Sequence, residues 1–528
     1  MGGAAAICYS AGMTISSTAG VPRPAVHGTL ISVAPGGTVR GVTENGVLRF
    51  LGIPYAAPPV GPYRFAVPQP VKPWNGVRDA LVPGPCAPQR LKPFPALDIE
   101  PLVGDAGVRG DDYLTLNIWA PEAGAQGFPT GRPVMVFIHG GGFVIGSKDA
   151  AVSNGTGFAR SGIVCVAINY RMGVDGFLPI PGVPTNLGLR DMIAALGWIR
   201  DNIAAFGGDP ANVTVFGESA GAMAIANLIA SPLAKGLFRR AIIQSGHGSM
   251  VRDIGVAQRL VKKLARILKV KPEKAGFDRC STDDLLDAAQ KASSPLARLD
   301  LRDAAGREPV FGISRFIPVY GDDVLPEPPL AALAKGTGSE VDLLIGTNTE
   351  EMRLYFVPTG IKSKMFGLLA RWVIGKSQPN AGKVLKAYGL GQPGRSPGDV
   401  FTEALSDLVF RWPARQFAAA HAAVSGGRTH MYEFDWRSPA CNGELGACHG
   451  IELPFVFDTL ATTTGPRGLA GEAPPQELAT RIHRLWVDFA TNGALPWGAF
   501  DSETRLVFQI AANKVVHEPV MPAVAFLP

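Results

Sequence analysis

The 528-residue chain lacks several features that would place it in other classes of protein. No run of five like charges occurs, and 50 basic against 44 acidic residues leave a formal charge of only +6, which argues against nucleic-acid binding. No apolar run approaches the roughly 18–20 residues that span a bilayer, so we expect no transmembrane segment. The first twenty residues carry no charge and no sustained apolar stretch, so we expect no cleavable signal peptide.

Cysteine is scarce and scattered. The six cysteines are Cys8, Cys86, Cys165, Cys280, Cys441 and Cys448. None has the spacing of a metal site, and we predict neither a metal nor a cofactor. Cys441 and Cys448 could close a short loop, but the sequence does not decide whether they pair. We interpret the thiols as reduced and the protein as cytoplasmic, with secretion as the alternative.

The chain is instead rich in glycine, and one glycine-containing segment carries chemistry. A short β-branched strand pattern, Val213–Phe216, leads into Gly-Glu-Ser-Ala-Gly, and an alanine-rich helical pattern follows. This strand–turn–helix context is typical of a nucleophile elbow, whose turn presents the Ser219 hydroxyl at its tip. The two glycines lack Cβ atoms and permit the sharp turn. The helix N-terminus then favours negative charge beside the serine.

The pattern around this elbow predicts an α/β fold. Continuous apolar runs at 134–138 and 164–168 are typical of strands buried on both faces. The apolar residues of 189–203 recur at helical spacing. This alternation predicts a central, mostly parallel sheet flanked by helices.

The length of the chain would suit two or three average domains, but large α/β folds with insertions also reach it. There is no internal repeat and no low-complexity linker. We therefore predict a single domain over residues 26–528 and a poorly ordered tail over residues 1–25. Mostly helical stretches near 250–300 and 360–425 are interpreted as insertions that cap the domain. No coiled-coil or repeat signal indicates an oligomeric state.

Three further groups complete the chemistry that a serine nucleophile needs. A base must take the hydroxyl proton, and a third group must orient that base. His449 is the candidate base, and Glu351, which follows an apolar strand, is the candidate acid; Glu350 is its rival. The order Ser, Glu, His is that of α/β hydrolases. The glycines of 139–143 follow another strand and can offer backbone N–H groups to an oxyanion.

Further segments extend this pattern nearly end to end. They are Phe50–Gly61 with Arg64 and Phe65, Asp112–Trp119, Asn169–Arg171, Phe206–Pro210 and Trp486–Ala490. Together with the serine segment, they resemble the type-B carboxylesterases, the family of bacterial para-nitrobenzyl esterases and cholinesterases. The resemblance implies the α/β-hydrolase fold with helical cap insertions, no cofactor, and a small-molecule ester as substrate.

The resemblance also implies an acyl-enzyme mechanism for a serine carboxylic-ester hydrolase. Ser219 attacks the ester carbonyl, His449 accepts its proton, and Glu351 orients His449. The backbone N–H groups that bind the oxyanion belong to Gly141, Gly142 and Ala220. Glu218, Ser245, Asp191 and Glu452 occupy family positions close to these residues, where each can either hold the fold or tune catalysis.

The chain departs from the family pattern in two respects. Met352 stands where the family usually has a glycine directly after the acid, so the placement of the Glu351 carboxylate is open. Tyr113 stands where many members have the cysteine that pairs with the equivalent of Cys86, and Cys280 likewise has no evident mate. We therefore expect both of these family disulfides to be absent.

The identity of the substrate is left partly open. The loop between Cys86 and Tyr113 has no tryptophan to hold a quaternary ammonium group, so a cholinesterase fits poorly and apolar or aryl esters are expected. An amide or carbamate hydrolase with the same triad is the alternative, and a non-catalytic binding protein of the same fold is a third possibility. Acyl-chain length and stereoselectivity are not determined by the sequence.

Two stretches admit two interpretations each. The basic residues of 259–269 lie opposite apolar ones on a helix, which indicates either an interfacial helix on anionic lipid or, as we favour, a solvated face over a packed one. A second set either lines a substrate gorge or packs within the cap: Met365, Phe366, Leu368, Leu369 and Trp372.

Overall fold

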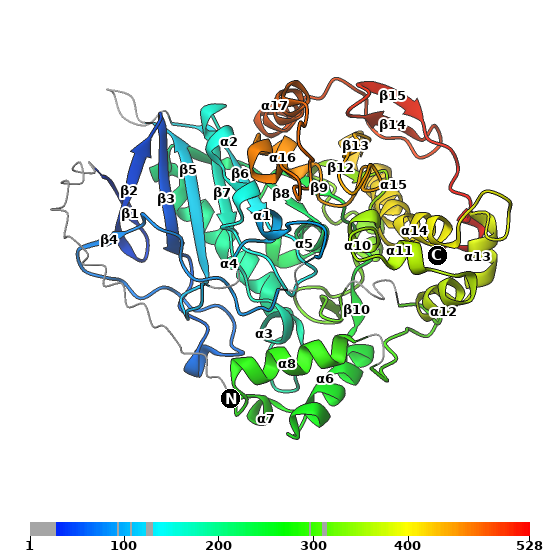
Figure 1. Cartoon of the computed structure of the whole chain (residues 1–528). Helices are drawn as coiled ribbons and strands as arrows, with labels where there is room; N and C mark the ends of the chain where they lie inside the picture. The colour runs from blue at the N-terminus through cyan, green and yellow to red at the C-terminus, as the bar shows by residue number, and fades with distance from the viewer. Residues whose placement is uncertain are drawn as a thin grey trace, which may run out of the picture.

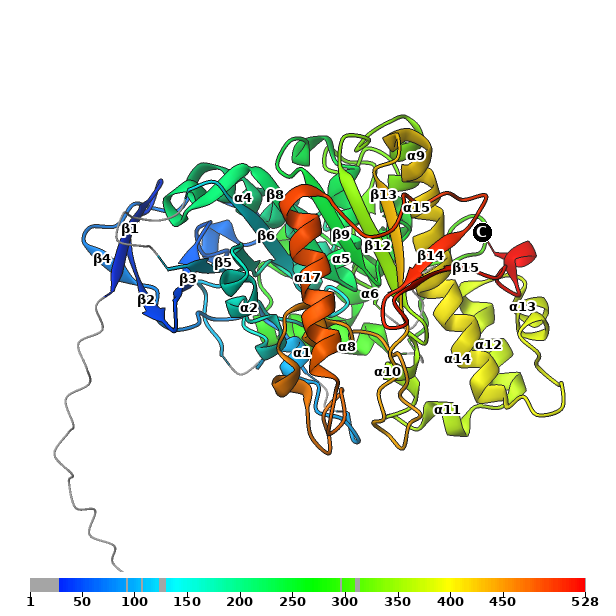
Figure 2. The same ribbon diagram turned by 90° about the horizontal axis from the view of Figure 1, so that it is seen from above.

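The computed structural model describes residues 28–91, 94–105, 108–122, 130–294, 297–308 and 314–527. The tail predicted for residues 1–25 lies outside these ranges. In the described part, a mixed sheet of thirteen strands runs through the molecule, with helices on both faces (Figures 1 and 2). Its strands follow the order β1-β2-β3-β5-β7-β6-β8-β9-β12-β13-β14-β15, with β4 paired to β2.

The strands of this sheet are β1 (Thr29–Val33), β2 (Gly37–Glu44), β3 (Val47–Pro54), β4 (Val77–Asp79), β5 (Thr115–Pro121), β6 (Arg132–Ile138), β7 (Val164–Ile168), β8 (Gly208–Glu218), β9 (Arg240–Gln244), β12 (Asp342–Asn348), β13 (Thr429–Phe434), β14 (Leu506–Gln509) and β15 (Lys514–His517). A small parallel pair, β10 (Arg252–Asp253) and β11 (Val319–Tyr320), is separate from it.

The helices are α1 (Glu100–Val103), α2 (Thr156–Arg160), α3 (Gly173–Phe177), α4 (Leu187–Asn202), α5 (Ala220–Ile229), α6 (Ile254–Leu268), α7 (Lys274–Phe277), α8 (Thr282–Ser293), α9 (Pro329–Ala334), α10 (Arg353–Phe356), α11 (Ile361–Lys364), α12 (Gly367–Ser377), α13 (Ala381–Ala387), α14 (Pro397–Ser406), α15 (Trp412–Ser425), α16 (Leu453–Val456) and α17 (Gln476–Asn492). A π-helical turn joins α14 to α15.

The centre of the sheet is parallel, as the apolar runs of the sequence predicted. From β7 through β6, β8, β9, β12 and β13 to β14, each strand pairs in parallel with its neighbour. Val136 of β6 stands opposite Val166 of β7 and Val215 of β8. All residues of β7 are buried, because helices cover both faces of the central strands.

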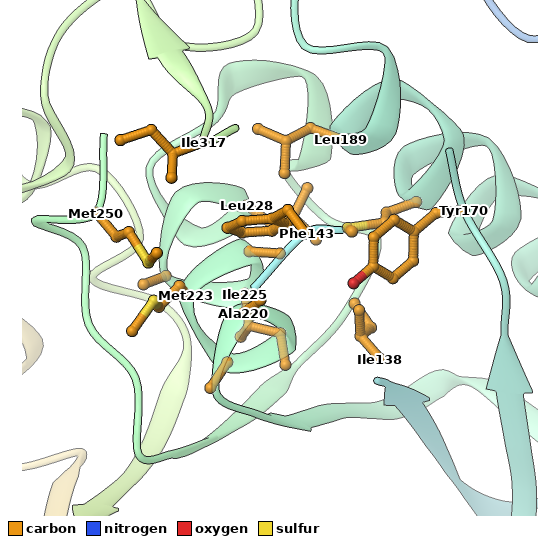
Figure 3. Close-up of a cluster of buried hydrophobic side chains, with 14 of the residues drawn as sticks. Ile138, Phe143, Tyr170, Leu189, Ala220, Met223, Ile225, Leu228, Met250 and Ile317 are labelled. Atoms are coloured by element: carbon orange, nitrogen blue, oxygen red, sulfur yellow. The ribbon is translucent and has the colours of Figure 1, made fainter. Parts of the chain in front are cut away.

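Alternate residues of the central strands pack into two hydrophobic cores, one on each face of the sheet. Val134, Val136 and Ile138 of β6 join the core that contains residues of α4 and α5. Met135 and Phe137, between them in sequence, join the core that contains residues of α2, α16 and α17. Figure 3 shows part of the first core, around the start of α5. The two cores hold the carboxyl ends of β6 and β8 in fixed register.

The strand that leads to Ser219 is longer than the sequence predicted. We expected a strand over Val213–Phe216, whereas β8 begins at Gly208 and ends at Glu218. The extension pairs Gly208 with Arg132 across a register shift. Its residues 209–212 are exposed or half-buried, so no apolar pattern marked them in the sequence.

The stretches interpreted as insertions are helical. Helices α6, α7 and α8 lie together at the lower edge of Figure 1, and α11 to α14 lie at its right. On α6 the apolar Leu260 and Leu264 are buried while the basic Lys262 and Arg266 are exposed, which confirms the favoured interpretation of that helix as a packed one with a solvated face. The division into one domain with two insertions stays a prediction.

Candidate active site

Ser219 lies on a tight turn between β8 and α5. Its φ and ψ of 55° and −123° fall in a region that residues with a side chain rarely adopt, so packing must hold the turn. The Ser219 N–H donates to the carbonyl of Gln244 at 2.9 Å. A Cβ atom on Gly221 would overlap the carbonyl oxygen of Ile138, and one on Gly217 would lie 2.6 Å from the same oxygen. The elbow therefore depends on both glycines because it touches β6.

His449 and Glu351 form a buried pair. Nδ1 of His449 donates to Oε2 of Glu351 at 2.7 Å, and the His449 backbone N–H donates to the Glu351 carbonyl at 3.1 Å. The other carboxylate oxygen accepts the N–H of Asn348 at 2.8 Å. Because a carboxylate at this position only accepts, Nδ1 carries the proton and Nε2 is left as the basic nitrogen of the neutral ring.

The rival acid Glu350 points to a different set of partners. Its carboxylate forms ion pairs with Arg353 at 2.8 Å and with Arg437, and it accepts the N–H of Ala447 at 2.9 Å. Met352, the departure from the family pattern, has φ −74° and ψ −4°, which any residue adopts. The structure therefore brings Glu351 to the histidine without a glycine at the next position.

Ser219 and His449 line the same cavity, which has a volume of about 180 Å³. Gly140, Gly141 and Gly142 form part of its wall beside the serine. The rest of the lining is mainly apolar: Phe94, Ile99, Leu102, Val103, Phe137, Val144, Ile145, Leu354, Tyr355 and Leu453. This lining suits an apolar ligand with one polar end at Ser219.

The glycine loop after β6 lies directly beside the elbow. Gly141 and Gly142 have φ of 100° and 63°, a conformation that favours glycine. Among the described residues, the N–H groups of Gly141, Gly142 and Ala220 meet no hydrogen-bond acceptor. Each of them is therefore available to a ligand oxygen.

His139 at the start of this loop is a residue that the sequence did not single out. Its Nδ1 lies 2.9 Å from the carbonyl of Gly140, and its ring stacks on Tyr170 with 4.5 Å between centroids. The Tyr170 hydroxyl donates to the His139 carbonyl at 2.8 Å. Burial lowers the pKa of His139 to about 4, so the ring is neutral and braces the loop.

Glu218 places a second carboxylate beside the histidine. Its Oε1 lies 2.9 Å from His449 Nε2. Among the described residues, no hydrogen bond joins Ser219 to His449 Nε2, so the two share the cavity without a direct bond. Burial lowers the pKa of His449, but Glu218, Tyr355 and Glu351 together outweigh burial, and the pKa is raised well above its ordinary value.

A buried polar network lies behind the pair. Asn348 Nδ2 donates to Glu452 Oε2 at 2.6 Å and to the Cys448 carbonyl at 2.7 Å. Gln244 Nε2 donates to Glu452 Oε1 at 3.2 Å. Burial, together with the charge of Glu218, raises the pKa of Glu452 to about 8. Glu452 thus connects the end of β9 to the loop that carries His449.

Two other residues singled out in the sequence lie outside this network. Asp191 is fully buried and binds Arg171 through 2.8 and 2.7 Å hydrogen bonds, so it holds the fold. Ser245 has a positive φ of 52°, and its N–H donates to Gly346 at 2.8 Å. The buried Ser245 hydroxyl has no hydrogen-bond partner among the described residues.

The described cysteines are free thiols: Cys86, Cys165, Cys280, Cys441 and Cys448. Cys441 and Cys448 are therefore not paired with each other in this structure, and Cys8 lies outside the described residues. Within the described ranges, no group of three or more His, Cys, Asp or Glu residues is arranged to hold a metal ion. No helix among them is both long and apolar enough to cross a membrane.

The fold, with a serine elbow between a parallel strand and a helix, defines an α/β hydrolase. The sequence model of the carboxylesterase family matches residues 29–522, and the chain belongs to that family. It is 36% identical over 487 residues to the para-nitrobenzyl esterase of Bacillus subtilis (strain 168), covering 89% of this chain and 92% of that protein. It is 32% identical over 480 residues to phenmedipham hydrolase of Pseudarthrobacter oxydans, covering 90% and 91%.

Solved structures agree with this assignment. A PNB esterase structure superposes with a TM-score of 0.77 at 34% identity, covering 93% of this chain and 97% of that one. A Geobacillus stearothermophilus carboxylesterase superposes with a TM-score of 0.78 at 32% identity, covering 93% and 98%. The predicted fold class and the predicted activity, carboxylic-ester hydrolysis, are both confirmed.

Proposed function

We propose that Ser219, His449 and Glu351 are the catalytic triad of this ester hydrolase. The observation that carries the proposal is the 2.7 Å bond between His449 and Glu351 beside a cavity that both His449 and Ser219 line. The neutral imidazole takes the serine proton through Nε2 as the hydroxyl attacks the ester carbonyl. Catalytic hydrogen bonds that are absent in the free enzyme commonly form only with substrate bound, which suits the separation of Nε2 from Ser219 here.

The oxyanion forms beside three free N–H groups. In this proposal Gly141, Gly142 and Ala220 donate to it, and one such donor contributes about 3–4 kcal/mol to transition-state stabilisation. His449 then returns the proton to the leaving alcohol. Water repeats the sequence on the acyl-enzyme and releases the acid.

The substrates we propose are apolar or aryl carboxylic esters. The support is the lining of the cavity, where Phe94, Leu354 and Tyr355 stand beside Ser219 and the glycine loop supplies the polar groups. Burial raises the pKa of Tyr355 to about 12, so its ring adds no negative charge to the cavity at neutral pH.

The test is steady-state hydrolysis of para-nitrophenyl esters from acetate to palmitate by the wild type and Ser219→Ala. We expect turnover to fall by more than about 10⁴-fold in the variant, with an optimum at short to medium acyl chains set by the cavity. Equal background rates in both proteins would overturn the proposal. A matched amide substrate in the same assay separates an esterase from an amide hydrolase.

We also propose a cytoplasmic location. The described free thiols, including the unpaired Cys441 and Cys448, suit a reducing compartment. Fractionation of cells that produce the full chain tests this proposal, and enrichment in the extracellular fraction would contradict it.

A further inference from the structure

One segment of the chain combines a strong positive charge with exposed apolar side chains. Residues 353–398 contain eight lysine or arginine residues and no aspartate or glutamate, although the chain as a whole is nearly balanced in charge. This segment forms α10 to α13. Three of the eight, Arg353, Lys362 and Arg395, pair with carboxylates outside the segment. The others remain to attract a partner of the opposite sign.

Helix α12 turns apolar side chains towards solvent. Leu368 is 77% exposed and Trp372 is 47% exposed, one turn apart on the same face, and Phe366 just before the helix is 56% exposed. The opposite face packs into the core through the fully buried Ala370 and Ile374. These three exposed residues therefore neither line a gorge nor pack within the cap, the two options that the sequence left open.

Three cations flank these apolar residues and are free of ion pairs. Lys364, Arg371 and Lys376 are exposed and pair with no carboxylate among the described residues. Lys376 instead lies over the ring of Trp372, with Nζ 5.1 Å from its centroid. Nearby Lys362 differs, because it is held between Asp399 and Glu444 at 2.9 Å from each.

We call the set Lys364, Phe366, Leu368, Arg371, Trp372 and Lys376 the α12 patch. It lies at the outer edge of the molecule, where α12 and α13 stand beyond the last strands of the sheet in both Figure 1 and Figure 2. Helix α13 adds the exposed Lys383 and Lys386 beside it. The patch is thus open to a large flat partner.

We propose that the α12 patch docks the enzyme onto an anionic lipid surface. Tryptophan and phenylalanine side chains favour the boundary between headgroups and acyl chains. Lysine and arginine around them attract anionic headgroups while their methylene stems lie along the apolar surface. A second copy of the chain is the poorer occupant, because two patches face to face would bring like charges together.

Helix α6 provides the matched comparison within the same chain. Its Lys262, Arg266 and Lys269 are exposed, so it also presents three cations to solvent. Its large apolar residues, such as Leu260 and Leu264, are buried. It therefore offers charge without side chains that can enter a bilayer, and we expect no docking through it.

The test is flotation of the full chain with vesicles of phosphatidylcholine, with and without phosphatidylglycerol. We expect binding only to the anionic vesicles, weakening as salt is added. Lys364→Glu, Arg371→Glu and Lys376→Glu together should lower the partition coefficient by at least about 100-fold, since each lost cation contributes about fivefold and each new carboxylate is repelled. Leu368→Ser with Trp372→Ser should lower it while leaving the charge unchanged.

The control is Lys262→Glu, Arg266→Glu and Lys269→Glu, which makes the same change of charge on α6 and should retain binding. Hydrolysis of a short soluble ester, unchanged in every variant, shows that each one is folded. The proposal is overturned if the wild type does not bind anionic vesicles, or if the α6 and α12 charge variants lose binding equally. It is also overturned if the wild type binds no vesicles but forms a dimer that Leu368→Ser with Trp372→Ser converts to a monomer.

Discussion

Nε2 of His449 lies 2.9 Å from Oε1 of Glu218, the residue that directly precedes Ser219. On the other side of the ring, Nδ1 lies 2.7 Å from Oε2 of Glu351. The imidazole therefore stands between two carboxylates in a buried site, and its protonated form is stabilised. In the proposed mechanism only the neutral ring accepts the serine proton, so we predict that Glu218 helps to set the pH at which the enzyme becomes active.

Glu218→Gln should move the acid limb of the pH–rate profile to lower pH. Burial lowers the pKa of His449, but Glu218, Tyr355 and Glu351 together raise it above its ordinary value, so removing the charge of Glu218 should lower the pKa again. The measurement is the pH at which the acid limb of kcat/KM falls to half its plateau, compared between the wild type and the variant. An acid limb that stays in place would contradict the assignment of this role to Glu218.

Two adjacent glutamates give a matched pair of variants. Glu351→Gln should lower kcat about 10⁴-fold, because the amide no longer holds the histidine in the required tautomer. Glu350→Gln should leave kcat within about tenfold of the wild type, since Glu350 contacts Arg353 and Arg437 and not His449. Steady-state kinetics on one para-nitrophenyl ester decides between them, and the reverse ranking would make Glu350 the acid.

Glu452 should make the protein less stable as the pH rises. Its pKa in the folded protein is about 8, against 4.5 for an ordinary glutamate, so the folded state holds its proton longer than the unfolded state does. The stabilisation is complete below pH 4.5 and is lost as the pH rises towards 8. The midpoint of thermal unfolding should fall less between these pH values for Glu452→Gln than for the wild type. An equal fall of the midpoint in both proteins would show that other groups cause the loss of stability.

A glycine in α5 and a glycine in α4 should respond oppositely to alanine. In Gly221→Ala the new Cβ overlaps the Ile138 carbonyl, so the elbow must shift, and we expect lost activity and a destabilisation of about 3 kcal/mol or more. Gly197→Ala meets no atom within 4 Å and should stabilise the protein by about 0.5–1 kcal/mol. Chemical unfolding of both variants measures the change in the free energy of unfolding. Equal changes in the two variants would contradict the close approach of Gly221 to Ile138.

Asp191 should matter for folding and not for chemistry. Its carboxylate binds Arg171 in a fully buried pair, and removing one partner of such a pair costs about 3–5 kcal/mol. Asp191→Asn should therefore lower the midpoint of unfolding strongly while the folded fraction retains its kcat. A lowered kcat in fully folded protein would instead give Asp191 a part in catalysis.

The sequence predicted those parts of the structure that local pattern determines. Strands β6 and β7 carry continuous apolar runs because both of their faces are buried. The elbow was recognisable in the sequence because its close contact with the backbone of β6 requires glycines. The start of β8 was missed because its first residues are exposed and carry no periodic pattern. The assignment of Glu351 over Glu350 came from the family register, and the contacts of the two carboxylates agree with it.

Other features could not be predicted because they depend on residues far apart in the chain. The contact of Glu218 with His449 requires the end of β8 to meet the loop after β13. Leu368 and Trp372 are exposed because the opposite face of α12 packs against the core. Both faces of the helix carry apolar residues, so the sequence did not show which face is buried.

The most direct test of the account is the mass of the intact enzyme, quenched in acid during turnover of para-nitrophenyl butyrate, followed by mapping of its peptides. The account predicts one added butyryl group on the peptide that contains Ser219, and no addition in Ser219→Ala. A butyryl group on another residue, or turnover by Ser219→Ala at the wild-type rate, would contradict it.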